Sequence, residues 1–208
     1  MSIPPCVFIV DDEYPVRHSL GLMMETAGYA CRTFGSAEAF LENYRPGRPG
    51  CLLLDVNLPG LNGDELQAEL IRRKIRLPII FLTAYGDIPM TVRAIKAGAV
   101  DFLTKPVSRD LLLERIRTVL EHEVQVNEQA AEHAQSMSQQ YGLTSREMEI
   151  MAWVVEGRSN KEIARQLGIS YRTVEIHRAR ILKKTGTTNP LELARLCEAV
   201  RPSPLPDS

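Results

Sequence analysis

The chain has 208 residues, of which 44% are hydrophobic and 25% are charged, and its formal net charge is −1. This composition is ordinary for a globular protein, and the length can hold one large domain or two modest ones. No run of about 18 apolar residues occurs, so we expect no membrane span. The first residues lack the basic and then apolar pattern of a secretion signal, which favours a cytoplasmic protein.

The four cysteines are widely spaced and form no CxxC pair. Cys6, Cys31 and Cys51 lie in strand-like apolar segments, and Cys197 lies near the C-terminus. This spacing favours free, mostly buried thiols over disulfides or zinc ligands.

The charges are unevenly distributed along the chain. Residues 158–184 contain eight Lys or Arg and two acidic residues, a local charge of +6, whereas the remainder carries −7. A compact basic segment in an acidic chain favours an anionic partner at that segment. The alternative, before its motifs are considered, is a solvated helical face.

Residues 5–121 alternate between short apolar segments and helical patterns. The apolar segments that we expect to form strands cover residues 6–10, 29–34, 51–55, 78–83 and 99–104. The helical patterns cover 16–27, 36–43, 62–74, 89–97 and 108–120, with Leu66, Leu70 and Ile71 on one face of the third. Strands that alternate with helices predict a parallel sheet covered on both faces. We expect an α/β domain of flavodoxin-like type, with strand order 2-1-3-4-5.

Polar residues follow four of these strands at their carboxyl ends, where such sheets bind ligands. The first strand leads to Asp11 and Asp12, the third to Asp55, the fourth to Thr83 and the fifth to Lys105. Asp55 by itself could be an ordinary strand terminus, but three carboxylates brought together repel one another. A hard divalent cation and one lysine would balance them, and oxygen ligands suit magnesium. Such a site can accept a phosphoryl group.

Residues 5–121 resemble the receiver domain of two-component response regulators. The resemblance rests on polar residues at the strand ends, which are Asp11-Asp12, Asp55, Thr83-Ala84 and Lys105-Pro106. The segments Gly86–Met90 and Ala94–Phe102 are similar to the FixJ type within that family.

The resemblance implies a role for each acidic residue. Asp55 would accept a phosphoryl group from a sensor histidine kinase. Mg²⁺ (or Mn²⁺) would be bound by Asp12, by Asp55 and by the backbone carbonyl of Asn57. Asp11 would act mostly through metal-bound water.

It also implies how the site responds to the phosphoryl group. Lys105 would pair with the phosphoryl oxygens, and its bond to Pro106 is expected to be cis. Thr83 would hydrogen-bond the phosphoryl group, and Phe102 would change rotamer behind it. Two positions near the expected output face depart from the commoner residues of the FixJ type, namely Thr104 and Val107.

Residues 122–140 are rich in Glu, Gln, Ala and His and contain neither Gly nor Pro. This composition favours continuation of the preceding helix over a flexible tether. We therefore predict a helical connector from about Ser108 to about Ser138.

Residues 141–200 contain four helix starts in quick succession. Thr144–Glu147 and Ser159–Glu162 are capping boxes, Ser170 caps a third helix that ends at Gly186, and Asn189-Pro190 begins a fourth. The second and third helices are joined by three residues that include a glycine, as in a helix-turn-helix. We expect an all-α domain of four helices, followed by a disordered tail over 201–208.

The third helix of this domain coincides with the basic segment. Val174, Ile181 and Leu182 should face the core, which leaves the basic side chains outward and makes double-stranded DNA the simplest partner. The residues that we expect at the DNA are Lys161, Arg172, Thr173, Glu175, Ile176, Arg178, Ala179, Arg180, Lys183 and Lys184. His177 is expected to pack rather than to bind a ligand.

The segments Leu143–Glu147, Asn160–Ala164 and Thr173–Arg178 resemble the LuxR/NarL-type output domain. By position, Glu175, Ile176 and Ala179 should face base edges, whereas the basic residues should hold phosphates. Glu175 stands where a lysine is common in relatives, and a carboxylate can accept a hydrogen bond from cytosine N4.

Together these features predict a transcription factor activated by phosphorylation. A sensor histidine kinase would phosphorylate Asp55, and the chain would then dimerise and bind promoter DNA, where RNA polymerase is a further partner. One alternative is a Mg²⁺-dependent phosphohydrolase, although Asn57 stands where such an enzyme would need a second acid. The other is a constitutive DNA-binding protein whose receiver is only an interaction module.

Overall fold

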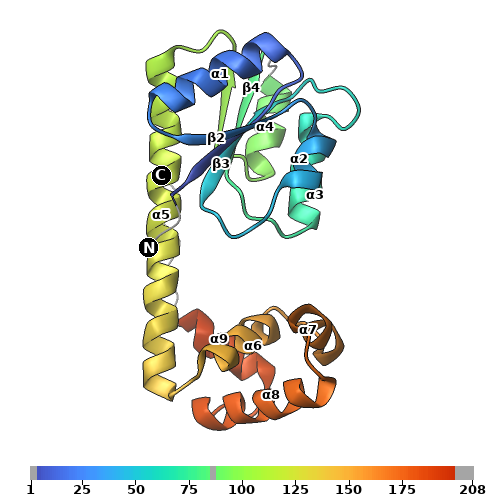
Figure 1. The fold of residues 1–208 in the computed structure, drawn as a ribbon, viewed down its shortest axis with the longest axis vertical. Coiled ribbons are helices and arrows are strands. Elements are labelled where there is room, and N and C mark those ends of the chain that lie inside the picture. The colour runs from blue at the N-terminus through green and yellow to red at the C-terminus, as the bar shows by residue number, and fades with distance from the viewer. Residues whose placement is uncertain (1–3, 85–87, 200–208) are drawn as a thin grey trace. The chain divides into compact units, whose positions relative to one another are not determined.

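A computed structural model describes residues 4–84 and 88–199 of the chain. The chain divides into two compact units, Met1–Gln125 and Val126–Ser208 (Figure 1). The predicted disordered tail, 201–208, lies outside the described residues, as does Gly86 of the FixJ-like segment.

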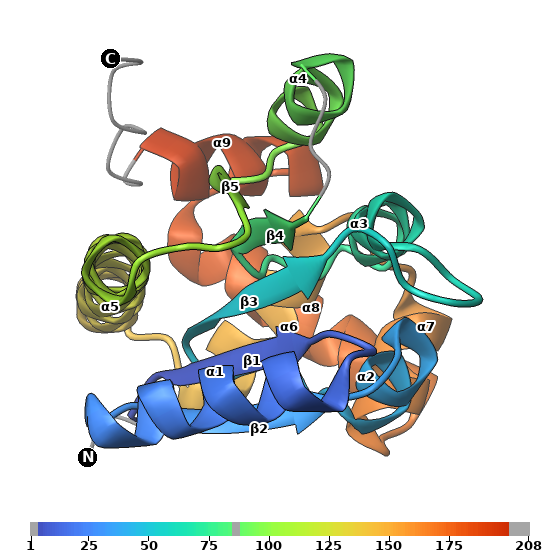
Figure 2. The same ribbon diagram turned by 90° about the horizontal axis from the view of Figure 1, so that it is seen from above.

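The first unit is built on a parallel sheet with strand order β2-β1-β3-β4-β5, as predicted (Figure 2). Among the described residues, its strands are β1 (Cys6–Val10), β2 (Ala30–Phe34), β3 (Gly50–Asp55), β4 (Ile79–Thr83) and β5 (Asp101–Thr104). Every residue of β1, β3 and β4 is buried. Strands covered on both faces favour the continuous apolar runs seen in the sequence.

Helices cover both faces of this sheet. They are α1 (Tyr14–Thr26), α2 (Ala37–Asn43), α3 (Gly63–Arg72), α4 (Ile88–Lys96) and α5 (Arg109–Tyr141). One core cluster packs α2, α3 and α4 against the sheet through residues such as Phe40, Leu66 and Ala94. The other packs α1 and α5 against the opposite face through residues such as Met24 and Ile116 (Figure 2).

Local sequence signals account for several helix starts. Ser36 accepts a hydrogen bond from the backbone amide of Ala39, and Asn62 forms a capping box with Glu65 at the start of α3. These side chains bond backbone amides that lack partners inside the helix.

The prediction that Ile71 shares the buried face of α3 was wrong. Ile71 is 56% exposed and does not share the buried face of Leu66 and Leu70, because it lies five residues beyond Leu66 and so is turned away from the core.

Helix α5 is continuous over thirty-three residues and includes the predicted helical connector. Its first part carries Leu112, Ile116 and Leu120 into the core of the first unit, and its last part carries Met137 into the core of the second. Most residues between these two parts are exposed. No helix among residues 4–84 and 88–199 is long and apolar enough to cross a membrane.

The second unit continues beyond α5 with α6 (Ser145–Val155), α7 (Asn160–Leu167), α8 (Tyr171–Thr185) and α9 (Pro190–Ala199). Both predicted capping boxes are present, and Gly168 and Gly186 end α7 and α8 in left-handed conformations with φ of 63° and 70°. Val174 and Ile181 of α8 are fully buried, as predicted, and Leu182 packs against the same core. The α7–α8 pair has the helix-turn-helix connectivity expected from the sequence.

The cysteines are free thiols, as predicted from their spacing. Cys6, Cys51 and Cys197 are buried and Cys31 is half-buried. Burial raises the pKa of Cys51 to about 12, so this thiol stays protonated and unreactive at neutral pH.

Gly63, the first residue of α3, has no room for a side chain. A Cβ atom there would lie 2.5 Å from the backbone oxygen of Asp55 and 2.9 Å from the Cα of Val56. We predict that Gly63→Ala lowers the free energy of opening of β3 by about 2 kcal/mol, because backbone atoms would have to move. Hydrogen exchange of the full chain, measured over β1 and β3, would test this.

Gly21→Ala in α1 is the matched control. A Cβ atom at Gly21 meets only the Thr33 methyl group, at 3.5 Å, which is ordinary contact. Alanine also favours a helix interior, so this variant should gain up to about 1 kcal/mol. Wild-type exchange rates in Gly63→Ala would contradict the steric argument.

Candidate functional site

The carboxyl edge of the sheet brings three aspartates together. Asp55 is the last residue of β3, and Asp11 and Asp12 directly follow its neighbour β1. One carboxylate oxygen from each of the three lies within 4.8 Å of the others. Asp11 and Asp55 are only 1% and 6% exposed, whereas Asp12 is exposed. The structure therefore gathers the acidic residues that the sequence predicted at this edge.

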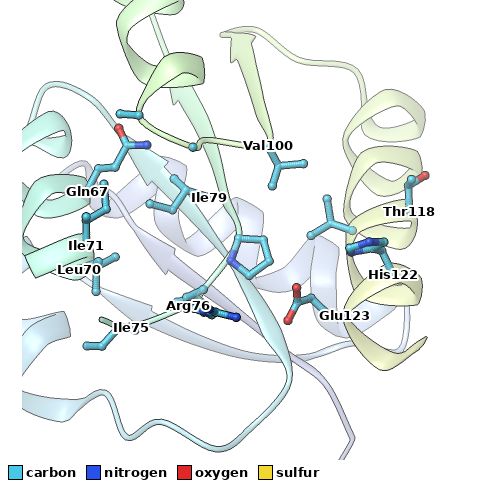
Figure 3. Close-up of a pocket in the computed structure, with 15 residues that line it drawn as sticks. Gln67, Leu70, Ile71, Ile75, Arg76, Ile79, Val100, Thr118, His122 and Glu123 are labelled. Atoms are coloured by element: carbon cyan, nitrogen blue, oxygen red, sulfur yellow. The ribbon is translucent and has the colours of Figure 1, made fainter. Parts of the chain in front are cut away.

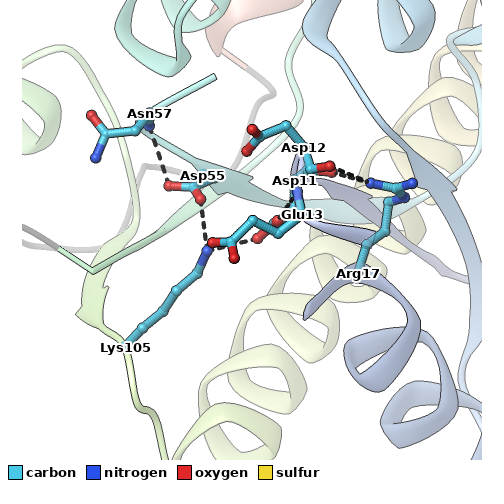
Figure 4. A network of polar contacts seen from close by, with 7 residues as sticks. All are labelled: Asp11, Asp12, Glu13, Arg17, Asp55, Asn57 and Lys105. Carbon is cyan, nitrogen blue, oxygen red and sulfur yellow. Dashed lines mark hydrogen bonds and ion pairs between the residues drawn. The ribbon is translucent and has the colours of Figure 1, made fainter. Parts of the chain in front are cut away.

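Lys105 lies between the two buried aspartates (Figure 4). Its Nζ is 2.7 Å from Asp11 Oδ2 and 2.6 Å from Asp55 Oδ2. Burial by itself would lower the pKa of this ammonium, but the hydrogen bonds and charges of Asp11 and Asp55 outweigh it and raise the pKa. Lys105 therefore stays charged, and its bond to Pro106 is cis, as expected.

The remaining oxygens of the buried aspartates accept backbone hydrogen bonds. Asp11 Oδ1 accepts from the amide of Glu13 at 2.9 Å, and Asp55 Oδ1 accepts from the amide of Asn57 at 3.2 Å. The Asp12 carboxylate has no hydrogen bond or ion pair to any residue that the structure describes. Of the three, Asp12 is thus the carboxylate with its oxygens open to a ligand.

This set of donors fits a divalent cation. Three carboxylates share the edge with one ammonium, so negative charge is left over, and all of the donor atoms are the hard oxygens that Mg²⁺ and similar ions prefer. The acidic cluster can therefore hold a divalent metal ion.

Thr83 and Phe102 lie on the neighbouring strands. Thr83 ends β4, is fully buried and is paired in register with Thr104 of β5. Phe102 is half-buried on β5, and its ring centroid is 6.0 Å from that of Phe81. The structure places them on β4 and β5, the two strands that follow β3 in the sheet, but their response to a phosphoryl group stays a prediction.

Arg17, which the sequence reading missed, contacts the acidic turn. Its Nη1 donates hydrogen bonds to the backbone oxygens of Asp11 and Asp12 at 2.5 Å and 3.2 Å (Figure 4). An arginine on an amphipathic helix looks like any solvated side chain, so the sequence held no signal for this contact.

A cavity of about 560 Å³ lies at the opposite edge of the sheet, where β4 begins (Figure 3). Its wall is mainly apolar and includes Ile71, Pro78 and Val100, with His122 and Glu123 of α5 at one side. None of the predicted site residues lines it, so it is separate from the aspartate cluster.

In the second unit, most residues predicted at the DNA lie on the surface of α8. The exposed members are Arg172, Glu175, Ile176, Ala179, Arg180, Lys183 and Lys184, together with Lys161 on α7. Thr173 and Arg178 are half-buried, and Arg178 Nη1 donates to Asn160 Oδ1 at 2.7 Å, which joins α8 to the start of α7. His177 is half-buried with its Nδ1 enclosed, in keeping with a packing role.

Comparisons with known proteins match both the first and the second unit of the chain to known families. The family model of the response regulator receiver domain matches residues 7–117, and that of bacterial regulatory proteins of the luxR family matches residues 141–197. Nodulation protein W of Bradyrhizobium diazoefficiens is 40% identical over 96% of this chain and 88% of its own length. The transcriptional regulatory protein FixJ of Rhizobium meliloti is also 40% identical, over 93% of this chain and 95% of its own.

Solved structures give the same result. The response regulator StyR covers 94% of this chain and 99% of its own, with 42% identity and a TM-score of 0.62. Full-length FixJ from B. japonicum covers 96% of this chain and 98% of its own, with 34% identity and a TM-score of 0.57. The chain belongs to the FixJ/NarL-type response regulators.

As a member of this family, the protein is a phosphorylation-activated transcription regulator and not a dedicated enzyme. Its receiver implies a sensor kinase as partner, and its luxR-type part implies DNA. The phosphohydrolase alternative is therefore excluded as the main function.

Lys184 of this response regulator has a second role that the sequence did not predict. It is exposed, as predicted, but its Nζ also donates to Glu147 Oε2 at 2.6 Å and to the backbone oxygen of Gly142 at 2.7 Å, so its contact with DNA stays a prediction. Glu147 is 3% exposed and also accepts from the amide and hydroxyl of Thr144. Burial alone would raise the pKa of Glu147, but the bonds from Lys184 and Thr144 outweigh it and lower the pKa to about 2.

Lys184 therefore neutralises a buried carboxylate inside the output domain. This pairing competes with a DNA phosphate for the same ammonium. The sequence missed this because Lys183 and Lys184 are adjacent and equally basic, and only the packing of α6 against α8 separates their roles.

We predict different effects for Lys184→Met and Lys183→Met. The first should destabilise the second unit by about 3 kcal/mol, because it leaves a buried carboxylate without its partner. The second should leave stability unchanged but reduce the slope of log K against log salt by about 0.9, because one phosphate contact is lost. Hydrogen exchange over α6 and α8, with DNA titrations at several salt concentrations, measures both. A reduced salt slope with full stability in Lys184→Met would favour it as a DNA contact instead.

Proposed function

We propose that Asp55 is the phosphoacceptor of this response regulator and that a sensor histidine kinase supplies the phosphoryl group. The observation that carries this proposal is the buried Asp55 carboxylate, held 2.6 Å from the Lys105 ammonium beside Asp11 and Asp12. One Asp55 oxygen would form the bond to phosphorus as the bond to the kinase histidine breaks. Lys105 would then pair with a phosphoryl oxygen, because its charge offsets the added negative charge.

Asp12 and Asp55, with the backbone carbonyl of Asn57, would bind Mg²⁺ (or Mn²⁺) directly. Both oxygens of Asp11 already accept hydrogen bonds, from Lys105 and from the Glu13 amide, which supports a role for Asp11 through water. The bound ion would supply positive charge to the phosphoryl oxygens.

Thr83 and Phe102 would report the phosphoryl group to the rest of the receiver. The Thr83 hydroxyl would donate to a phosphoryl oxygen, and Phe102 would change rotamer as Thr83 moves. Their adjacent strands and the half-buried setting of Phe102 support this coupling, because a half-buried ring has space on one side.

Residues 5–121 would form the receiver, 122–140 the helical linker and 141–200 the output domain. The division of the chain between Gln125 and Val126, within the expected linker, supports these boundaries. The protein would act in the cytoplasm, where promoter DNA and the cytoplasmic part of a sensor kinase are accessible.

Phosphorylation would promote a homodimer through α4 and β5. Ile88, Val92 and Ile95 on α4 are 81%, 44% and 44% exposed, and they recur at helical spacing on one side. Apolar side chains at this spacing support a helix face that is buried against a partner. A second copy would place the two α8 helices on half-sites about one DNA turn, roughly 34 Å, apart.

Within the dimer, exposed residues of α8 would read promoter DNA. Glu175, Ile176 and Ala179 would face base edges, while Arg172, Arg180 and Lys183 would hold phosphates, with Lys161 of α7 beside them. Glu175 could accept from cytosine N4, which would give this protein a base preference of its own. RNA polymerase is the further partner that we expect at the promoter.

Labelling with acetyl phosphate tests the phosphoacceptor directly. Wild-type protein with Mg²⁺ should gain one acid-stable, base-labile phosphoryl group, measured by intact-mass spectrometry. Asp55→Asn should gain none, since the amide cannot form an acyl phosphate.

Asp101→Asn is the matched control, because Asp101 lies on β5 paired with Arg115, away from the cluster. Label that persists in Asp55→Asn would refute Asp55 as the acceptor. Label that leaves the affinity for DNA unchanged would refute the switch and favour the constitutive DNA-binding protein.

The dimer face is tested by Val92→Glu. A carboxylate in the centre of the apolar α4 stripe should prevent dimerisation of the phosphorylated receiver, because the charge would be desolvated at the interface. Sedimentation velocity of the labelled protein should show a monomer, with labelling itself unchanged. Leu22→Glu on α1, where Leu22 is 51% exposed, should still give the dimer. A dimer in Val92→Glu would exclude this face.

A further inference from the structure

Arg17 joins the first turn of α1 to the acidic turn that precedes it. It is the fourth residue of the helix, and one guanidinium nitrogen, Nη1, donates to the backbone oxygens of both Asp11 and Asp12. The guanidinium also lies 5.6 Å from the centroid of the Tyr14 ring. A Cβ atom at Gly35, in the turn after β2, would lie 3.6 Å from the same group. Arg17 therefore sits where the turns after β1 and β2 meet.

The two carbonyls that Arg17 binds belong to the peptide units that present the acidic side chains. Asp11 has further support, because its carboxylate accepts from Lys105 and from the Glu13 amide. The Asp12 carboxylate has no such contact within the described part of the chain. Its direction therefore depends on its own backbone, which Arg17 holds at the carbonyl (Figure 4).

The charge of Arg17 and its position have opposite effects on metal affinity. A guanidinium close to a cation site repels the cation, so removal of this charge alone should strengthen metal binding. Any weakening of metal binding on loss of Arg17 must then come from lost orientation of the acidic turn. The sign of the change in metal affinity therefore distinguishes lost charge repulsion from lost orientation.

We propose that Arg17 is a positioning residue of the metal and phosphoryl site, which orients the Asp12 carboxylate by binding the carbonyls of Asp11 and Asp12. The proposal rests on the proposed role of Asp12 as a metal ligand. Contacts that orient metal ligands typically change metal affinity by 10–100-fold when they are removed.

The test is the affinity of the full chain for Mg²⁺, measured by isothermal titration calorimetry. Arg17→Gln should raise the Mg²⁺ dissociation constant about tenfold. The labelling rate with acetyl phosphate at saturating Mg²⁺ should change by less than about twofold, because Asp55 and Lys105 keep their contacts. A merely structural role would instead lower the rate at every Mg²⁺ concentration.

Arg32→Gln on β2 is the charge control. Arg32 is exposed and rests on the Phe34 ring, so its loss removes one positive charge from the same unit without touching the acidic turn. Its Mg²⁺ affinity should stay within about twofold of wild type or become slightly tighter. Equal or tighter binding in Arg17→Gln would overturn the proposal.

Arg17→Lys tests the positioning role of Arg17 if Arg17→Gln does not fold. A lysine keeps the charge, but its side chain is shorter and its ammonium would approach the two carbonyls less closely, so binding should weaken about threefold. Wild-type affinity in this variant would overturn the proposal. Absence of Mg²⁺ binding in the wild-type protein would instead refute the metal site itself, which keeps the two failures distinct.

Discussion

The rest of the first unit depends on the ion pairs among Asp11, Asp55 and Lys105 at the carboxyl edge of the sheet. Asp11 and Asp55 are buried side by side, and the Lys105 ammonium is shared between them at 2.7 and 2.6 Å. Two buried carboxylates this close repel each other unless a cation or a shared proton offsets their charge. Because these residues follow β1, β3 and β5, the same interaction ties three strands together. A phosphoryl group on Asp55 would change the partners of Lys105 and so disturb the end of β5.

From Lys105 the backbone leads within a few residues into α5, which ends at Tyr141. The carbonyl of the next residue, Gly142, accepts from Lys184 in the last turns of α8. Lys184 also binds the buried Glu147 of α6, so the end of the linker helix, the start of α6 and the recognition helix meet at one ion pair. The connection from Asp55 to α8 is thus made of covalent chain and one ion pair.

The elements that sequence reasoning predicted correctly are those with local or periodic signals. Buried parallel strands read as apolar runs, helix starts carry Asn62, Thr144 or Ser159, and polar strand ends must converge at one edge of a parallel sheet. The misses concern side-chain contacts that leave no mark in a residue pattern. Lys184 binds Glu147 thirty-seven residues away, and Arg17 binds backbone oxygens, which no residue pattern reveals. Ile71 was assigned to the wrong face because a five-residue step rotates it away from Leu66.

We propose that a charge change at Asp55 alters the oligomeric state and the affinity for DNA. Sedimentation and operator binding of the full chain, with and without beryllofluoride and Mg²⁺, test it most directly, because beryllofluoride mimics a phosphoryl group on an aspartate. A shift from about 1:99 to 99:1 between states requires about 5.5 kcal/mol, which is a change of roughly 10⁴ in the equilibrium constant. We expect a monomer that becomes a dimer and binds the operator more tightly with beryllofluoride. Identical sedimentation and identical operator affinity in both conditions, with beryllofluoride bound at Asp55, would contradict it.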